Sequence, residues 1–434
     1  MRVKGFLLVL VLTATFSACL DEGVPSAGAP GAAGPFASLA SWTGVKIGAG
    51  GDAESSTTVS PDGKTILACS HGGFTKPSPL WASEDGGASF RYIDPQPNPI
   101  VSGDCDLAIT DNGDWYIVYD TIASATVAGS SDKGRTWRFH YVAAPPFGGV
   151  DRPWIQAVGN ELYLVYADVM AAEPFLSLFT KSTDGARTWS PPTPMGYARS
   201  TDQSNCFMGH HIVKDKGQTI RTPINCWPEY TDSGATFPNT INFMTSRDAG
   251  RTWITEKVTG PHISSLRTTS ASYAGANGAV LWLTYSVDNK TGGRDVFAIR
   301  SIDDGKTWSQ PLLVFPGTMV PLGWAWIDGR PDGSATVAWM DNKKPGNVSD
   351  ARRYWQVRAA RLDVDGNLAW VMPVGEPALG DAIYEFLMLD HDAQGRAHIV
   401  YVVPGDGCGQ NPPAPTGATR NRQCVRYFRE DAAT

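Results

Sequence analysis

The sequence has few charged residues and no block of one sign. Charged residues make up 18% of the 434 residues, whereas an average soluble domain has about 25%. The formal net charge is −7, and no segment is rich in Lys and Arg, which argues against nucleic acid as a partner. Past the N-terminal segment, no apolar run is long enough to cross a membrane.

Familiar catalytic motifs are also missing. The chain contains no Gly-x-Ser-x-Gly, no His-Glu-x-x-His and no phosphate-binding loop. Residues 363–367, Asp-Val-Asp-Gly-Asn, resemble a calcium loop but lack its distal Glu, so we interpret them as a hairpin turn. We therefore predict no metal site and no cofactor, and a structural calcium ion has no support in the sequence.

The N-terminus has the features of an export signal. Basic residues at 2 and 4 precede the apolar run 6–14, and the small residues Ser17 and Ala18 precede Cys19. The segment is similar to a bacterial lipoprotein box, in which Cys19 becomes the lipidated first residue; an ordinary signal peptide cut near Ala18 is the alternative. We expect a protein of the bacterial cell envelope, held at the membrane only by its lipid, or else secreted.

These features divide the chain into three parts. Residues 21–35 are rich in Gly, Ala and Pro, as in a flexible tether. The predicted boundaries are 1–18 for the signal peptide, 19–40 for the lipidated Cys and tether, and 41–434 for one folded domain, which we expect to be a monomer. The 46 Gly and 31 Pro residues of the chain favour many short strands and turns in that domain.

An eight-residue pattern, Ser-x-Asp-x-Gly-x-Thr-Trp, recurs five times with small departures. The copies are residues 83–90, 130–137, 182–189, 246–253 and 301–308. Ser and Asp side chains bond the backbone of tight turns, Gly supplies a positive φ, and Trp packs between layers. We therefore interpret the pattern as a structural hairpin connection and assign no catalysis to it.

A second repeat, an alternating apolar strand that ends in an aromatic residue, extends the count to seven units. Clear copies are residues 115–119, 162–166, 280–285, 335–339 and 398–401, with looser copies at 65–69 and 219–226. The last unit has three strands, and residues 42–47 could supply its fourth, which would close a ring and remove exposed sheet edges. The predicted fold is all-β: a single β-propeller of four-stranded antiparallel blades, seven favoured and six as the alternative.

This register brings cysteines together on the face opposite the repeated turns. It predicts the disulfides Cys69–Cys105, Cys206–Cys226 and Cys408–Cys424, as expected for an exported chain; free buried thiols are the alternative. Polar residues collect on the same face. The starts of first strands carry Asp104, Asp106, Asp151, Arg152, Arg267, Tyr384 and Glu385, and the ends of second strands carry Asp120, Asp168, Asp288 and Asp341. Such a ring could bind a cation or a polyhydroxylated ligand, or consist of solvated loop charges.

The five copies resemble the Asp-box, or BNR repeat, of sialidase-like propellers. The resemblance covers residues 50–430 and implies three arginines for a sugar carboxylate, a Tyr nucleophile paired with a Glu, and an Asp acid/base. The Arg-Ile-Pro segment expected near the first blade is missing, and residues 151–154, Asp-Arg-Pro-Trp, come nearest to it. The implied catalytic residues are Tyr384, Glu385 and Asp151, although neighbours on a strand face apart. The implied substrate-binding residues are Arg152, Arg267, Arg221, Asp104, Asp106 and Trp154.

Two functions remain open from the sequence. One is glycan processing at the cell surface, with exo-α-sialidase-type hydrolysis as its specific form. The other is a non-catalytic surface propeller that binds glycan or protein. Because a fold does not fix a function, the sequence leaves enzymatic activity undecided, and we expect a carbohydrate or glycoprotein ligand in either case.

Overall fold

A computed structural model gives the structure of the chain. It describes residues 41–49, 54–72, 77–93, 102–121, 123–143, 148–168, 176–195, 205–227, 240–258, 266–288, 294–319, 325–341, 354–379, 387–404 and 423–431. The chain divides into two compact units, Met1–Ala32 and Ala33–Thr434. All described residues belong to the second unit. The predicted signal peptide, the lipidation site Cys19 and most of the predicted tether lie outside the described residues.

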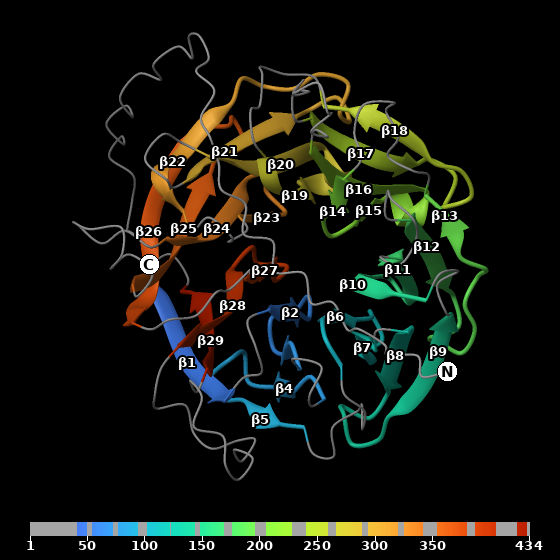
Figure 1. Ribbon diagram of the computed structural model, residues 1–434. Helices are drawn as coiled ribbons and strands as arrows, with labels where there is room; N and C mark the ends of the chain where they lie inside the picture. Colours follow the sequence, from blue (N-terminus) through green and yellow to red (C-terminus); the bar gives the residue numbers. More distant parts are fainter. Residues whose placement is uncertain are drawn as a thin grey trace, which may run out of the picture. The chain divides into compact units, whose positions relative to one another are not determined.

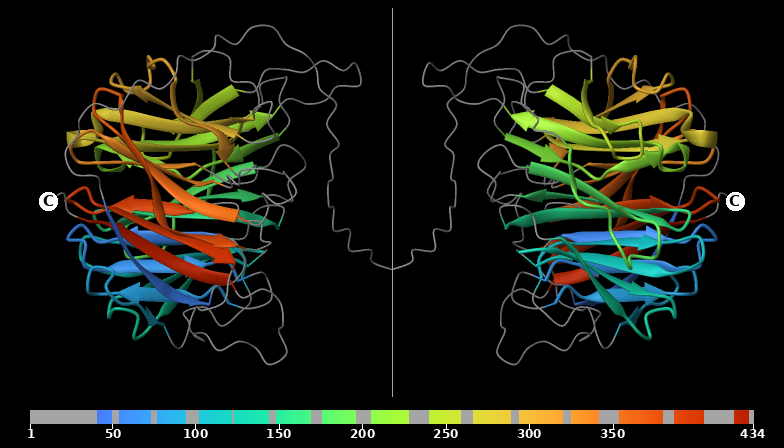
Figure 2. Two further views of the ribbon diagram at one scale, coloured as in Figure 1. Left: turned by 90° about the vertical axis from the view of Figure 1, so that its left-hand side faces the viewer. Right: turned by 90° about the vertical axis from the view of Figure 1, so that its right-hand side faces the viewer.

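The second unit is a ring of seven four-stranded antiparallel blades, which confirms the predicted fold (Figure 1). Blade 1 comprises β2 (Ser55–Val59), β3 (Ile66–Ser70), β4 (Leu80–Ser83) and β5 (Arg91–Tyr92). Blade 2 comprises β6 (Cys105–Ile109), β7 (Trp115–Asp120), β8 (Ala125–Ser130) and β9 (Arg138–Ala143). Blade 3 comprises β10 (Val150–Val158), β11 (Glu161–Asp168), β12 (Leu176–Ser182) and β13 (Thr193–Pro194). In each blade the first strand is innermost, and the sheets fan around a common axis (Figure 1). Figure 2 shows the same blades from two sides.

Blades 4 to 7 repeat this plan. Blade 4 comprises β14 (Asn205–Met208), β15 (Ile212–Lys214), β16 (Thr219–Trp227), β17 (Thr240–Ser246) and β18 (Ile254–Lys257), and blade 5 comprises β19 (Leu266–Ala274), β20 (Val280–Asp288), β21 (Arg294–Ser301) and β22 (Leu312–Met319). Blade 6 comprises β23 (Trp326–Gly329), β24 (Ala335–Asp341), β25 (Tyr354–Leu362) and β26 (Leu368–Leu379). Blade 7 comprises β27 (Met388–His391), β28 (Ala397–Pro404), β29 (Gln423–Glu430) and the N-terminal strand β1 (Trp42–Ala49). In blade 4 the first strand is broken into β14 and β15, which both pair with β16.

The N-terminal strand closes the ring, as predicted. β1 pairs antiparallel with β29, from Trp42 opposite Glu430 to Ala49 opposite Cys424. β1 therefore joins the two ends of the described chain in one sheet, with β1 at its outer edge (Figure 1). Apart from two 3-10 turns, Asp215–Gly217 and Ala276–Gly278, the described residues form no helix, and none of them belongs to a helix that could span a membrane.

The five repeated turns share one hydrogen-bond pattern, shown here for residues 130–137. Ser130 Oγ donates to Asp132 Oδ1 at 2.9 Å and accepts from Gly134 N at 2.8 Å. Asp132 in turn accepts from Thr136 N at 2.8 Å and from Thr136 Oγ1 at 2.6 Å. Two successive residues, Lys133 and Gly134, have positive φ, which suits a hairpin between twisted strands. The other four turns keep the Ser and Asp bonds.

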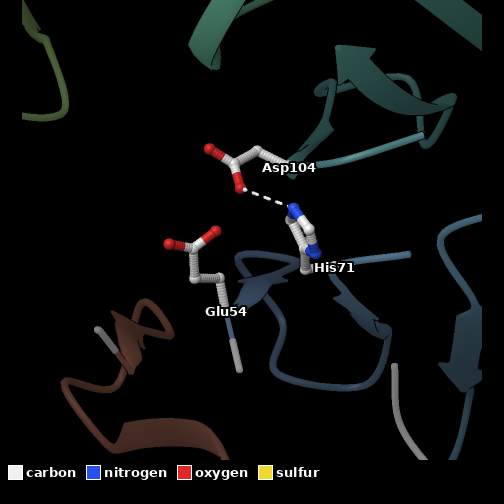
Figure 3. A group of neighbouring side chains, drawn as sticks. All are labelled: Glu54, His71 and Asp104. Carbon is white, nitrogen blue, oxygen red and sulfur yellow. Dashed lines mark ion pairs between the residues drawn. The ribbon is translucent and has the colours of Figure 1, made fainter. Parts of the chain in front are cut away.

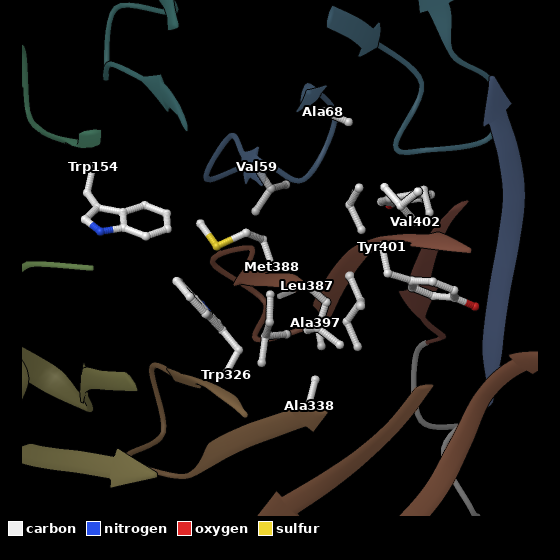
Figure 4. Packing of buried hydrophobic residues seen from close by; sticks show 14 of the residues in the cluster. Val59, Ala68, Trp154, Trp326, Ala338, Leu387, Met388, Ala397, Tyr401 and Val402 are labelled. Atoms are coloured by element: carbon white, nitrogen blue, oxygen red, sulfur yellow. The ribbon is translucent and has the colours of Figure 1, made fainter. Parts of the chain in front are cut away.

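The aromatic residues of the repeated turns pack between blades. Trp253 of blade 4 lies against Phe179 of blade 3, with ring centroids 5.3 Å apart, and Trp308 of blade 5 stacks on Phe243 of blade 4 at 6.1 Å. The strands themselves supply the fully buried Trp81, Trp115, Trp282 and Trp339. Apolar residues of the inner strands, including Val59, Trp326 and Met388, meet near the axis (Figure 4). The repeated turns therefore join neighbouring blades through apolar contact.

Candidate functional site

Ionisable side chains converge where the inner strands of blades 1 to 3 begin. Each lies at a strand end: Glu54 directly before β2, His71 directly after β3, Asp104 directly before β6, Asp120 at the end of β7, and Asp151 and Arg152 near the start of β10. We call these six residues the acidic rim. The antiparallel order places the starts of first strands and the ends of second strands on one face, so residues as far apart in the sequence as Glu54 and Asp104 become neighbours.

Three members of the acidic rim come from two adjacent blades and form a compact group (Figure 3). One ligand-type atom from each of Glu54, His71 and Asp104 lies within 4.8 Å of the other two. His71 Nε2 is 3.6 Å from Asp104 Oδ1. Asp104 is buried, while Glu54 and His71 are half-buried, so the group borders solvent on one side.

A second group shares Asp104 and consists of carboxylates alone. Oxygens of Asp104, Asp120 and Asp151 also lie within 4.8 Å of one another. Asp120 is 1% exposed and accepts from Gly103 N at 2.8 Å. Burial, followed by the nearby Asp104 and Asp151 carboxylates, raises the pKa of Asp120 well above its usual value. The interior face of the acidic rim therefore disfavours further negative charge.

The cationic member of the acidic rim has an unusual backbone. Arg152 has a φ of 50°, a value that is rare for a long side chain. It lies where the pairing of β10 with β11 shifts, between Asp151 and Trp154. Its Nε is 3.8 Å from Asp151 Oδ2. Strained backbone of this kind concentrates at functional sites, and here it holds a guanidinium beside the carboxylates.

A disulfide connects the segments that carry the acidic rim. Cys69 and Cys105 are bonded, as predicted; Cys69 is two residues before His71, and Cys105 directly follows Asp104. Cys206 and Cys226 are opposite each other in the β14–β16 register. Cys424 is disulfide-bonded, and its predicted partner Cys408 lies outside the described residues. The first disulfide therefore fixes the segment of His71 to the segment of Asp104.

The inner strands also enclose a cavity of about 260 Å³ near the axis. Asp106, predicted to bind substrate, is 1% exposed in its wall. It accepts from Ser56 Oγ at 2.6 Å and from Ile155 N at 2.7 Å, and lies 3.2 Å from His210 Nε2. Burial opposes the charged form of His210, but the Asp106 carboxylate outweighs it and raises the pKa of the ring. Asp106 thus links the inner strands of three blades to His210.

Two histidines and a tryptophan pack together at this cavity. His210 and His211 lie in the break between β14 and β15, with rings stacked 5.1 Å apart, whereas neighbours within a regular strand would point to opposite faces. Trp154, a predicted substrate-binding residue, is 2% exposed and packs against His210 and Trp326. A ring so deeply buried packs behind two residues that line the cavity, His210 and Trp326.

Arg221, another predicted substrate-binding residue, does not lie at the acidic rim. Arg221 is fully buried, and its Nη1 pairs with Asp304 Oδ1 at 2.9 Å while its Nε lies 3.3 Å from Glu256. Asp304 belongs to a repeated turn, so Arg221 stabilises the opposite face. The side chain of Arg267, and the residues Tyr384 and Glu385, lie outside what the structure describes.

The sequence reasoning missed two members of the acidic rim, Glu54 and His71. Glu54 precedes β2 as Asp104 precedes β6, and His71 follows β3 closely. The signal that could have found them is positional: both flank blade 1 strands at the register already used for blade 2. The position of His71 two residues after Cys69 would have added weight.

Comparison with known proteins supports the fold and no single activity. No protein-family model matches the chain, and no curated protein matches its sequence. An ulvan lyase, polysaccharide lyase PL25 bound to a GlcA–Rha3S saccharide, is similar with a TM-score of 0.53 and 11% identity over 88% of this chain and 95% of that one. The structure of YCF48 bound to a D1 peptide is similar with a TM-score of 0.50 and 11% identity, over 92% of this chain and 99% of that one. A Hadza microbial sialidase is similar with a TM-score of 0.46 and 16% identity, over 75% of this chain and 71% of that one.

Proposed function

We propose that this propeller binds or processes glycans at the acidic rim. The observation that carries the proposal is the convergence of four carboxyl groups, an imidazole and a guanidinium from three blades on one face. Carboxylates accept hydrogen bonds from sugar hydroxyls, and a guanidinium donates a bidentate pair to a carboxylate or sulfate. A few convergent polar groups on a rigid scaffold are typical of a ligand site.

The similar structures are consistent with this proposal at a coarse level. The ulvan lyase is a propeller of comparable chain length that holds a saccharide containing glucuronate and a sulfated sugar. In an acidic polysaccharide of that kind, a carboxylate or sulfate would suit the guanidinium of Arg152, and the hydroxyl groups would suit the carboxylates of the acidic rim. The likeness itself extends only to the fold, so the ligand class rests on the side chains.

The more specific form of the proposal is hydrolysis of exo-sialidase type by an Asp-box propeller. In that form Asp151 is the acid/base, Tyr384 and Glu385 are the nucleophile and its base, and Arg152 and Arg267 hold the sugar carboxylate. The repeated turns support the family resemblance through their sequence and bonding. The buried Arg221 does not support a third arginine at the site, which weakens the specific form relative to the general one.

A non-catalytic binding propeller is the second candidate. YCF48 in complex with a D1 peptide is a propeller of similar extent that binds a polypeptide. In this candidate the acidic rim contacts a cationic or hydroxylated segment of a partner and carries out no bond cleavage.

Fluorogenic sialosides and a glycan array test these alternatives together. We expect glycan binding by the full chain, a loss of binding in Arg152→Ala, and retention in Arg251→Ala, a control in an exposed repeated turn. Cleavage of a sialoside that disappears in Arg152→Ala would establish the specific form. Binding of no glycan by a folded chain would overturn the general proposal and favour the polypeptide-binding candidate.

We also propose export and anchoring through a lipid on Cys19. The order of basic residues, apolar run and Ser17-Ala18-Cys19 supports it. In a bacterial host, labelled palmitate should enter the wild-type chain, while Cys19→Ser should remain unlabelled and leave the membrane fraction. Labelling of Cys19→Ser would refute the assignment.

A further inference from the structure

We propose that Glu54, His71 and Asp104 form a binding site for one zinc ion. The three side chains lie together at the acidic rim (Figure 3). Imidazole nitrogen and carboxylate oxygen are ordinary zinc ligands. The proposal does not depend on glycan recognition, because zinc binding is measured on the protein alone.

The spacing of the ligand atoms supports a metal between them. At 3.6 Å, His71 Nε2 and Asp104 Oδ1 are too far apart for a hydrogen bond. Zinc–ligand bonds of about 2.0–2.2 Å place tetrahedral ligands roughly 3.3–3.6 Å apart, so this pair already has the separation that two zinc ligands require. The Glu54 carboxylate lies within 4.8 Å of both other atoms and can reach the same ion with a small side-chain rotation.

The ligands are held in place before any ion binds. The Cys69–Cys105 disulfide ties the segment of His71 to that of Asp104. His71 N donates to Glu54 O at 2.8 Å, and Gly72 N donates to Gly103 O at 3.2 Å. These bonds fix the backbones of all three ligands to one another, so metal binding orders few additional dihedral angles.

The chemistry of the group favours zinc over calcium. Two carboxylates and a neutral imidazole balance a dication, and nitrogen ligands select transition metals over the oxygen-seeking calcium ion. The alternative all-oxygen group includes Asp120, one oxygen of which already accepts from Gly103 N at 2.8 Å. Three protein ligands at a partly open position leave room for a fourth, solvent-derived ligand.

Metal titration of the full chain tests the proposal. After treatment with a chelator, the chain is titrated with zinc, manganese and calcium by calorimetry, and bound metal is counted by mass spectrometry. We expect one zinc per chain, bound more tightly than manganese or calcium. His71→Ala and Glu54→Gln should each weaken zinc binding by more than about tenfold, because each removes one of three ligands.

Two controls separate ligand loss from misfolding. His140→Ala changes a half-buried histidine on β9 outside the group and should bind zinc like the wild type. Glu54→Gln preserves the shape of a half-buried residue, and its circular dichroism and melting temperature without metal should match those of the wild type. Absence of zinc uptake, a preference for calcium, or unchanged zinc affinity in both ligand variants would each overturn the proposal.

Discussion

The repeated turns and the inner strands use the same residue, aspartate, in opposite electrostatic situations. In the repeated turns, Asp132 accepts from the Thr136 hydroxyl and backbone, and these bonds lower its pKa to about 2. At the acidic rim, burial and neighbouring carboxylates raise the pKa of Asp120. In the cavity wall, burial and then Asp328 raise the pKa of Asp390 to about 7.

This difference in the environment of aspartate indicates that the two regions have different roles. Both carboxylate oxygens of a turn aspartate are engaged within the turn, because they accept hydrogen bonds from residues at most four positions away. A rim aspartate is crowded by like charges, an arrangement that costs stability and concentrates at functional sites. The comparison assigns the repeated turns to folding and supports our proposal that the opposite face binds a ligand.

The largest expected effect is the loss of the disulfide behind the acidic rim. The Cys69→Ala/Cys105→Ala double variant should lose roughly 4 kcal/mol of unfolding free energy, because the bond closes a loop of 36 residues. Denaturant unfolding of both proteins measures this loss. If the midpoints coincide, the covalent link does not stabilise this face, and the rim segments are held by their other contacts alone.

The next effect is a pH dependence of opposite sign in the two regions. Because the pKa of Asp390 is raised to about 7 in the fold, its contribution to stability is lost as the pH rises from about 4 to 7, by roughly 3 kcal/mol between pH 5 and pH 8. Asp390→Asn should remove this slope. Asp132, with a lowered pKa, stabilises the fold above about pH 4 and loses that effect toward pH 2.

Denaturant unfolding at pH 5 and pH 8 measures the first slope. Asp390 accepts hydrogen bonds from Val59 N and His391 N, so Asp390→Asn also loses one bond at every pH. The quantity to compare is therefore the difference in unfolding free energy between pH 5 and pH 8, in the wild type and in the variant. An identical difference in wild type and variant would place the titrating group elsewhere.

The smallest expected effect compares adjacent serines in one repeated turn. Ser130 is buried and its Oγ accepts from Gly134 N, so Ser130→Ala should cost about 2 kcal/mol by leaving a buried donor unsatisfied. Ser131 is exposed, and Ser131→Ala should change stability by less than about 0.5 kcal/mol. Thermal unfolding distinguishes them; equal effects would mean that the turn is not held by its serine.

The fold could be predicted because its information is local and repeated. Each turn is specified within eight residues, and the spacing of turns fixes which strand ends share a face. That register alone sufficed for the Cys69–Cys105 pair and for the closing strand at Trp42–Ala49. It also placed Asp104 and Asp151 together at the rim.

The remainder of the site depends on distances that no repeat encodes. Arg221 occupies the start of β16, yet its partner Asp304 comes from the next blade, and nothing in either segment predicts that ion pair. The break that stacks His210 on His211 is likewise a single irregularity of blade 4. Side-chain direction at such places follows from packing between blades.

One measurement tests the division of roles most directly: glycan affinity and melting temperature for Asp104→Asn and Asp132→Asn, side by side. The account predicts that Asp104→Asn loses affinity by more than about tenfold while melting near the wild-type temperature, because a rim carboxylate serves the ligand. Asp132→Asn should melt earlier and keep its affinity while folded. The reverse assignment, with affinity lost from the turn variant and kept in the rim variant, would contradict the account.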